Sequence, residues 1–424
     1  MVLEDASKKR IAVVGTGISG LTCAWLLAPV HDVTVFEARD RIGGHTHTVT
    51  VERPQGHYAI DTGFIVYNER NYPGFTRLLA ELGVESQPTS MSFSVRCDRT
   101  NTEYNGSSLN QLFAQRRNLF RPRFLGMVRD ILRFNREAAA LGDEVDDHVT
   151  VGAWLASRDY GEAFVEHYLV PLGSSLWSSP PGTFLEFPIR FVVEFLQNHA
   201  MLELEGRPAW KVIRGGSRSY IDALVRPFRD RIRLATPVRR VLRREGGVIV
   251  EPASGPAESF DEVVFACHSD QALAALGDPT PLEREVLQAV PYEANEVVLH
   301  TDTSLLPKRR RAWASWNYHV RADAPERATV TYDMNILQSL DAPETFCVTL
   351  NETDAIDPAK ILGTYRYHHP VFGPRRAAAQ NRHAELIRQR HTSYCGAWWG
   401  YGFHEDGVQS ALRVGEAFGR RLPS

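Results

Sequence analysis

Two short, mostly apolar runs and the helical segment between them open the chain. Residues Arg10–Val14 end at a glycine, which is typical of a buried parallel strand. Ile18–Leu27 has helical character, and Asp32–Phe36 is a second β-rich run. Together the three segments predict a β-α-β unit.

The rest of the chain alternates between helical and β-rich segments, and it contains no repeat. We expect helix over 75–145 with a polar, β-type interruption at 91–104, and helix mixed with a Pro/Ser/Trp-rich loop over 150–205. Further predictions are a β-hairpin at 238–250, a buried strand at 263–266, strands within 290–350 and a helix at 407–420. Segments of similar type lie far apart in the sequence, so the domains are expected to be discontinuous.

Composition narrows the class of protein. A chain of 424 residues exceeds what one hydrophobic core usually covers, so two packed units are expected. A net charge of -3 argues against a surface that coats nucleic acid, and no nucleic-acid partner is expected. The five cysteines are scattered and include no C-x-x-C pair, which argues against a disulfide framework or structural zinc and favours a reducing compartment.

A glycine-rich turn joins the first predicted strand to the first predicted helix. It reads Gly15-Thr16-Gly17-Ile18-Ser19-Gly20. Gly15 permits the tight turn, Gly17 lets a diphosphate approach the backbone, and Gly20 lets the helix pack closely on the strand. The helix N-terminus offers N–H groups and a positive dipole end to phosphates. Glu37, at the end of the second strand, is placed to bind an adenosine ribose. This context favours a dinucleotide site over a glycine turn without a ligand.

The residues that follow the second strand carry a family resemblance. Segment 37–44 reads Glu-Ala-Arg-Asp-Arg-Ile-Gly-Gly, which resembles the same place in the flavin-containing amine oxidase superfamily. The resemblance implies that the cofactor is FAD and that the second arginine and the paired glycines lie at its diphosphate. Many members have arginine directly after those glycines, whereas this chain has His45. Residues 61–64 are similar to the superfamily stretch that runs under the flavin ring.

The C-terminal residues resemble the same superfamily. Gly396 and the run 400–408 precede a predicted helix, as in the superfamily segment whose helix N-terminus points at the flavin. A helix N-terminus stabilises the negative charge of reduced flavin, although a capped turn before a packing helix is the alternative. Val238 matches the superfamily position that touches adenine. Covalent-flavin members carry a cysteine where this chain has none, since Cys395 is only adjacent, so FAD is expected to be non-covalent.

These matches define a set of expected FAD contacts, without a catalytic residue or a metal ligand. The set is Gly15, Gly17, Ile18, Ser19, Gly20, Glu37, Ala38, Arg39, Arg41, Gly43, Gly44, His45, Thr46, Thr62, Gly63, Phe64, Val238, Gly396, Asp406, Gly407 and Val408.

The resemblance also implies a fold. We expect an α/β protein with a Rossmann-type FAD-binding domain of the glutathione-reductase-like, amine-oxidase type, beside a discontinuous α+β substrate-binding domain. The FAD-binding domain is expected to comprise residues 1–75, 206–275 and 385–424. The substrate-binding domain is expected to comprise residues 76–205 and 276–384.

Several residues near these segments have two interpretations. The aromatic residues of 398–401 could form the amine cage of amine oxidases or pack as core. Lys211 could hold a water at the flavin N5, although an exposed or ion-paired lysine is the simpler interpretation. His404 and Glu405 could act as acid or base, or could cap the helix; His268 is interpreted as structural. No second dinucleotide fingerprint is found, so the substrate itself is the expected reductant.

Three features of the sequence favour a lipid as the substrate or as the surface to which the protein binds. Residues 116–136 combine seven arginines with apolar residues, which suits a basic amphipathic helix on an anionic bilayer; a core helix with a solvated arginine face is the alternative. Residues 308–311 form a second basic cluster. The aromatic-rich stretch 184–196 could line an acyl tunnel or form core.

A narrower resemblance agrees with a lipid substrate. Residues 45–48, 61–68, 173–178 and 331–335 look like a bacterial subgroup of FAD-dependent oxidoreductases similar to the N-terminal oxidase-like region of plant cyclopropane fatty-acid synthases. The likeness implies oxidation or desaturation of a methyl-branched fatty acyl chain in membrane phospholipid, by hydride transfer to flavin N5. It also implies a functional link to a cyclopropane-synthase-type methyltransferase. The alternatives are an amine oxidase, a flavin-dependent double-bond isomerase and a non-catalytic flavoprotein partner of such a methyltransferase.

The expected location is cytoplasmic, at the inner face of the membrane or free of it. The first residues lack the apolar core and cleavage site of a secretion signal, and no apolar run is long enough to span a bilayer.

Overall fold

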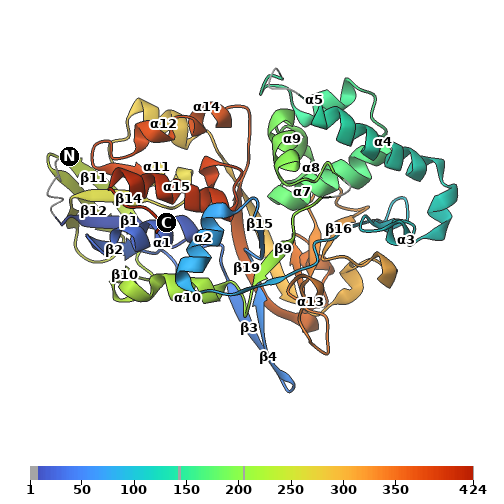
Figure 1. The fold of residues 1–424 in the computed structure, drawn as a ribbon, viewed down its shortest axis with the longest axis horizontal. Helices are drawn as coiled ribbons and strands as arrows, with labels where there is room; N and C mark the ends of the chain where they lie inside the picture. The colour runs from blue at the N-terminus through green and yellow to red at the C-terminus, as the bar shows by residue number, and fades with distance from the viewer. Residues whose placement is uncertain (1–7, 142–144, 204–205, 424) are drawn as a thin grey trace.

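The chain forms two units that lie side by side (Figure 1). The computed structural model describes residues 8–141, 145–203 and 206–423. Residues 1–7, on which the expectation about a secretion signal partly rests, lie outside the described residues. Among the described residues, no helix is both long and apolar enough to cross a membrane.

A five-stranded parallel sheet is the centre of the first unit. Its order is β10-β2-β1-β14-β20. Its strands come from widely separated parts of the chain: β1 (Arg10–Val14), β2 (Asp32–Phe36), β10 (Ile232–Arg233), β14 (Glu262–Phe265) and β20 (Thr392–Tyr394). The apolar side chains of β1 and β2 point to both faces and are almost all buried, as expected for a sheet covered on both sides. The predicted β-α-β unit is therefore confirmed.

Helices and a three-stranded meander cover this sheet. The helices of the first unit are α1 (Ile18–Leu27), α2 (Pro73–Leu82), α10 (Arg218–Val225), α11 (Ser269–Ala275), α12 (Pro281–Leu287), α14 (Arg376–Gln380) and α15 (His404–Ala417). The meander consists of β11 (Val238–Arg244), β12 (Gly247–Pro252) and β13 (Glu258–Phe260). The predicted hairpin at 238–250 is thus confirmed, and the predicted C-terminal helix begins and ends three residues earlier than expected.

A seven-stranded sheet is the centre of the second unit. Its order is β19-β15-β18-β17-β16-β7-β8, and all its pairings are antiparallel except that of β16 with β7. The strands are β7 (Phe93–Cys97), β8 (Thr102–Asn105), β15 (Tyr292–His300), β16 (Trp316–Val320), β17 (Val330–Asp333), β18 (Cys347–Leu350) and β19 (Ile361–Pro370). The β-type interruption expected at 91–104 is the hairpin of β7 and β8.

The helices of the second unit gather beside this sheet (Figure 1). They are α3 (Leu109–Leu112), η1 (Arg116–Phe120), α4 (Pro122–Ala139), α5 (Val151–Ala156), α6 (Glu162–Phe164), the π-helical turn η2 (Val165–Leu169), α7 (Val170–Trp177), α8 (Pro181–Leu185), α9 (Ile189–Asn198) and α13 (Met334–Leu337). Aromatic residues of 184–196 are buried in their shared core, which supports the core interpretation of that stretch over an acyl tunnel.

Two small sheets lie at the junction of the units. The hairpin of β3 (Thr48–Arg53) and β4 (Gly56–Asp61) projects from it (Figure 1). The strands β5 (Val66–Asn68), β9 (Trp210–Ile213) and β6 (Ser86–Pro88) join chain segments from both predicted domains. The α/β fold with a Rossmann-type unit and a discontinuous α+β unit is confirmed. The exact domain boundaries stay a prediction, and α12 and α14, which fall within 276–384, lie with the first unit (Figure 1).

Candidate functional site

The turn between β1 and α1 leaves open space above the start of the helix. Gly15 has a φ of +112° and its N–H donates to the Phe36 carbonyl at 2.8 Å. A Cβ on Gly20 would lie 2.1 Å from the Gly15 oxygen, so only glycine permits this packing. A Cβ on Gly17, by contrast, would meet no described atom within 4 Å, and no described side chain caps the helix. The first N–H groups of α1 therefore face a space that can receive an anion.

The second glycine pair lies directly against this turn. The Gly43 N–H donates to the Thr16 carbonyl at 3.1 Å, and a Cβ on Gly44 would lie 2.9 Å from the Gly17 Cα. The Arg41 guanidinium donates to the Gly44 carbonyl at 2.8 Å. Two glycine motifs that are separated in the sequence thus form one backbone cradle, with a cation beside it.

Glu37 closes one side of the cradle. Its carboxylate accepts hydrogen bonds from the Thr16 N–H at 3.0 Å and the Arg39 N–H at 2.9 Å, and also from the Thr16 hydroxyl. Its carbonyl accepts from the N–H of Thr236, two residues before Val238. The predicted ribose and adenine contacts therefore share one edge of the site, next to the exposed Ala38.

Helices from opposite ends of the chain meet at the cradle. A Cβ on Gly407 would lie 2.8 Å from Ile18 Cγ2 and 2.9 Å from Ser19 Oγ, and one on Gly415 would lie 2.8 Å from Leu26 Cδ1. These contacts, eight residues apart on one helix and seven or eight on the other, show that α1 and α15 run parallel with their N-termini side by side. Two adjacent positive dipole ends are stabilised by an anion placed at both. A dinucleotide diphosphate and an anionic flavin meet that requirement, so the site fits FAD.

The segment before α15 is fixed by its own polar groups. The Asp406 carboxylate accepts from the Phe403 N–H at 2.9 Å and caps the helix. Burial raises the pKa of Asp406 to about 7. The Gly396 N–H donates to the Ser410 hydroxyl at 2.9 Å, and Val408 is buried. The predicted residues of this segment thus lie at or near the start of α15.

The predicted flavin-ring segment is attached to the second glycine motif and to the start of α15. A Cβ on Gly63 would lie 1.9 Å from the His45 carbonyl, which accepts from the Phe64 N–H at 2.9 Å. The Phe64 ring stacks on His404 with centroids 3.5 Å apart. His404 Nε2 lies 3.1 Å from the Thr46 hydroxyl. His404 therefore joins the N-terminal and C-terminal segments and has a packing role.

Uncharged imidazole and phenol groups line the junction of the units. The His45 ring lies 5.4 Å from Tyr367, 5.3 Å from His369 and 5.9 Å from His268, measured between centroids. Burial lowers the pKa of His45 and of His369 to about 3, and that of His268 to about 4. The Tyr367 hydroxyl is 2.9 Å from the Thr62 hydroxyl. Sequence reasoning did not assign Tyr367 or His369 to the site, although the run Tyr-Arg-Tyr-His-His on β19 was a usable signal.

Three other candidates have structural roles. Lys211 Nζ pairs with Glu69 Oε1 at 2.5 Å near the surface, which supports the ion-paired interpretation and not a place at flavin N5. The Glu405 carboxylate accepts from the Gly74 and Phe75 N–H groups, each at 2.9 Å, and so caps α2. His268 stacks on Tyr292, with centroids 4.2 Å apart.

The aromatic residues before α15 divide into two groups. Trp398 and Trp399 stack on each other at 4.1 Å, and Trp399 stacks on His383 at 4.0 Å; all three are buried. These tryptophans are core residues of the first unit. Tyr401 instead lies against α9, where its ring stacks on Phe191 at 5.1 Å.

Phe403 continues the same contact between the units. Its ring stacks on Phe195 of α9 with centroids 5.0 Å apart. Phe372 also contacts Phe191, at 4.9 Å. An aromatic wall formed by α9 therefore faces the chain immediately before α15.

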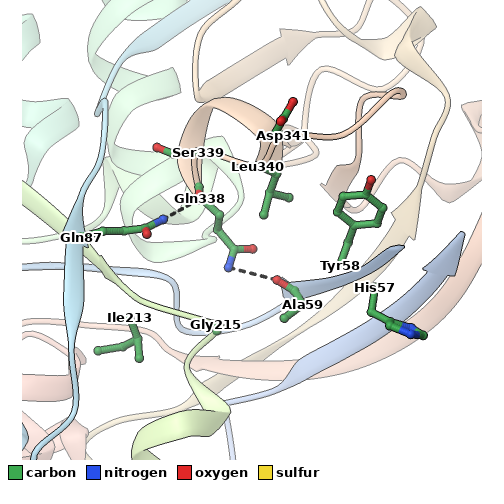
Figure 2. Close-up of a pocket in the computed structure, with 11 residues that line it drawn as sticks. His57, Tyr58, Ala59, Gln87, Ile213, Gly215, Gln338, Ser339, Leu340 and Asp341 are labelled. Atoms are coloured by element: carbon green, nitrogen blue, oxygen red, sulfur yellow. Dashed lines mark hydrogen bonds between the residues drawn. The ribbon is translucent and has the colours of Figure 1, made fainter. Parts of the chain in front are cut away.

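A separate cavity of about 250 Å³ lies beside the flavin-ring segment (Figure 2). Gln338 crosses it and donates to the Ala59 carbonyl at 3.3 Å and to Asp61 Oδ2 at 3.1 Å. Asp61 also accepts from the Ser217 N–H at 3.0 Å, and burial raises its pKa to about 6. The cavity is smaller than most cofactor sites. Within residues 8–141, 145–203 and 206–423, no group of three or more His, Cys, Asp or Glu side chains is arranged to hold a metal.

Comparison with known proteins agrees with this geometry. Residues 18–333 match the model of a family described as flavin containing amine oxidoreductase. Cyclohexylamine oxidase from Brevibacterium oxydans IH-35A has a TM-score of 0.70 at 17% identity, covering 97% of this chain and 98% of that one. The CLA-producing fatty acid isomerase from P. acnes has a TM-score of 0.65 at 15% identity, with the same coverage. Identities this low show the shared fold alone.

Similarity to tryptophan 2-monooxygenases is local. Tryptophan 2-monooxygenase of Agrobacterium tumefaciens (strain Ach5) is 56% identical over 43 residues, which are 10% of this chain and 6% of that protein. The chain thus spans only a small part of such relatives. The family match, the fold and the cradle together identify FAD as the cofactor.

Proposed function

Because the chain belongs to the flavin-containing amine oxidoreductase family, we propose that it uses FAD to oxidise or desaturate a fatty acyl chain, methyl-branched and carried by membrane phospholipid. The general activity, FAD-dependent oxidation without a specified substrate, follows from membership of the family. When bound, FAD supplies an acceptor for a hydride or its equivalent at N5.

The aromatic wall of α9 carries this proposal. Tyr401 and Phe403 flank Gly402 just before α15, and their rings lie against Phe191 and Phe195. Phe191 and Phe195 are buried in the core and keep water away from this segment, whereas Tyr401 and Phe403 are only partly buried and provide the dispersion contacts for a methylene chain. An acyl chain is the substrate that such a surface favours.

The uncharged histidines support the same choice. His45, His268 and His369 lie at the junction of the units, and burial depresses their pKa values far below neutrality. Neutral imidazoles impose no desolvated charge on an apolar substrate. They also leave a hydrogen-bonding group available to receive or donate a proton near the site.

The tryptophan pair argues against an amine oxidase. Trp398 stacks on Trp399, and Trp399 stacks on His383, in the core of the first unit. They are therefore not available to form the aromatic cage that would receive a neutral amine. The cyclohexylamine oxidase that shares the fold keeps this activity as an alternative to be tested.

A double-bond isomerase is the second candidate. A protein of the same fold, from P. acnes, is a CLA-producing fatty acid isomerase. In an isomerase the reducing equivalents return to the substrate, so no external electron acceptor is needed. The link to a cyclopropane-synthase-type methyltransferase remains a proposal that rests on the sequence resemblance.

Anaerobic mixing separates these functions. The holoenzyme is mixed with a branched-chain phospholipid in detergent micelles, and flavin absorbance is followed together with the mass of the acyl product. Lasting bleaching with loss of two hydrogens supports oxidation. A product of unchanged mass without lasting bleaching assigns the isomerase, and bleaching by cyclohexylamine alone overturns the lipid proposal.

A matched pair of variants tests the wall itself. Phe191→Leu removes aromatic contact with Tyr401 and should raise KM for the lipid several-fold while FAD remains bound. Phe260→Leu, a buried phenylalanine that packs on Phe36 in the first unit, should lower stability to a similar degree with no change in KM. Equal KM values for the two variants would show that the aromatic wall does not contribute to substrate binding.

A further inference from the structure

The largest concentration of exposed apolar side chains lies on one part of the second unit. Among the described residues, seven large hydrophobic side chains are exposed, and five of these lie between residues 109 and 132. Their exposed fractions are 75% for Leu109, 44% for Leu119, 85% for Phe120, 43% for Leu125 and 51% for Leu132. We call this surface, formed by α3, η1 and the outer side of α4, the α3–α4 face.

Helix α4 shows why these residues face outward. Phe124, Met127, Phe134 and Ala138 form its buried stripe. Leu125, Arg129, Leu132 and Arg136 recur at intervals of three and four residues on the opposite side, and all four are exposed. The outer stripe therefore alternates apolar and cationic side chains. The buried stripe agrees with the core-helix interpretation, and the exposed leucines leave the interpretation as a membrane-surface helix open.

Cations surround the apolar side chains. Arg116 donates to the Phe113 carbonyl and Arg117 to the Asn101 carbonyl. Both acceptors are uncharged carbonyl groups, so these hydrogen bonds do not neutralise the positive charges of the two guanidinium groups. The exposed run Lys308-Arg309-Arg310-Arg311 belongs to the same region because η5 (Arg310–Ala312) packs against α3.

Acidic groups in this region are mostly occupied within the protein. Asp130 is buried and accepts from the Gly161 N–H at 3.1 Å. Glu103 is buried and accepts from the backbone N–H groups of Lys308 and Arg309. Glu162 and Glu166 pair with Arg123. The face as a whole is apolar and positively charged.

We propose that the α3–α4 face binds the surface of an anionic phospholipid bilayer. Phe120 and Leu109 enter the interfacial region, and the surrounding arginines contact lipid phosphates. Charge complementarity selects this occupant, because apolar side chains ringed by cations match an anionic interface, and the described partners of Arg116 and Arg117 are uncharged groups. The face lies at the end of the molecule remote from the five-stranded sheet (Figure 1). The proposal goes beyond the proposed function, since the face binds a bilayer whatever substrate the flavin oxidises.

Co-sedimentation of the holoenzyme with vesicles tests the proposal. Vesicles of phosphatidylcholine alone are compared with vesicles in which part of the lipid is phosphatidylglycerol, at low and high salt. We expect binding to the anionic vesicles only, weakened by salt because screening acts on exposed charges. Absence of pelleting with anionic vesicles, or equal pelleting with both compositions, overturns the proposal.

Two pairs of variants locate the contact. The double variant Leu109→Ser and Phe120→Ser should weaken vesicle binding by at least about tenfold, because two apolar contacts are lost. Arg116→Gln with Arg117→Gln should do the same for anionic vesicles. The matched controls, Val30→Ser with Leu234→Ser and Arg218→Gln with Arg229→Gln, alter exposed residues of the first unit and should leave binding unchanged. Controls that lose binding equally overturn the assignment.

Two further outcomes keep this proposal separate from the proposed function. If the protein binds vesicles but does not oxidise lipid, the membrane proposal stands and the proposed lipid oxidation fails. If it oxidises lipid in micelles but does not bind vesicles, the proposed oxidation stands and the membrane proposal fails. A concentration-dependent dimer that the Phe120 variant abolishes, without vesicle binding, assigns the face to a second copy of the chain and overturns the membrane proposal. Flavin absorbance and thermal unfolding confirm that each variant is folded.

Discussion

Gly407 in α15 lies so close to Ser19 in α1 that a Cβ on the glycine would stand 2.9 Å from the serine Oγ. The contact joins the two ends of the chain at the point where both helices begin. Two positive helix ends repel each other unless an anion lies between them, so the bound cofactor contributes to the stability of this arrangement.

Gly407→Ala tests that relationship. The added methyl group would meet Ile18 Cγ2 at 2.8 Å and Ser19 Oγ at 2.9 Å, and would push the two helices apart. We expect a loss of about 1–3 kcal/mol in the free energy of unfolding and a lower FAD content. Thermal unfolding and the flavin-to-protein absorbance ratio measure both. Gly182→Ala, where a Cβ meets no described atom within 4 Å, is the control and should behave as wild type.

Glu37→Gln tests the ribose edge of the site. The carboxylate accepts from the Thr16 and Arg39 N–H groups on its two oxygens, whereas an amide would turn an NH2 group toward one of these donors. We expect FAD affinity to fall by about tenfold to a hundredfold. Titration of the apoprotein with FAD measures the Kd, and Glu245→Gln in the exposed hairpin turn provides the comparison. Unchanged affinity would show that Glu37 has a role in the turn alone.

The histidines at the junction predict sensitivity to acid. His45, His268 and His369 are neutral in the folded protein, because burial lowers their pKa values to about 3 or 4, but they titrate near 6.5 when unfolded. Below pH 6.5 the unfolded chain therefore binds more protons than the folded one. Their stabilising contribution is complete above pH 6.5 and falls by about 1.4 kcal/mol per pH unit for each histidine as the pH drops toward 4.

A single substitution isolates this effect from other groups. Buried Asp61 and Asp406 titrate in the opposite sense, since burial raises their pKa values. His369→Gln removes one group that takes up a proton on unfolding, so it should reduce the loss of stability between pH 7 and pH 5 by about 2 kcal/mol relative to wild type. Urea unfolding at three pH values measures the slope. His57→Gln alters an exposed histidine and should keep the wild-type slope.

The cysteine positions predict that FAD is released intact. Cys395 is buried, and its neighbour Gly396 donates to Ser410 in α15. Heat or acid denaturation should leave all of the flavin in the supernatant, as judged by absorbance and mass spectrometry. Flavin that stays with the precipitated peptide would show a covalent bond.

The sequence by itself determined the nucleotide turn and its immediate surroundings. The positive φ of Gly15 and the packing of Gly20 on the Gly15 carbonyl are set by local backbone sterics, and the strand and helix on either side follow from local periodicity. The hairpin at 238–250 and the C-terminal helix were predictable for the same reason. The arginine face of α4 was also visible as a pattern, but the exposure of Leu125 and Leu132 beside it was not.

Only the tertiary structure decided which distant residues share the site. The contact of Gly407 with Ser19, the group formed by His45, His268 and Tyr367, and the burial of Trp398 beside His383 all join segments that are remote in the sequence. Local propensity carries no information about such contacts, because they depend on how two discontinuous units pack against each other. The same packing determines whether an aromatic side chain faces the substrate or the core.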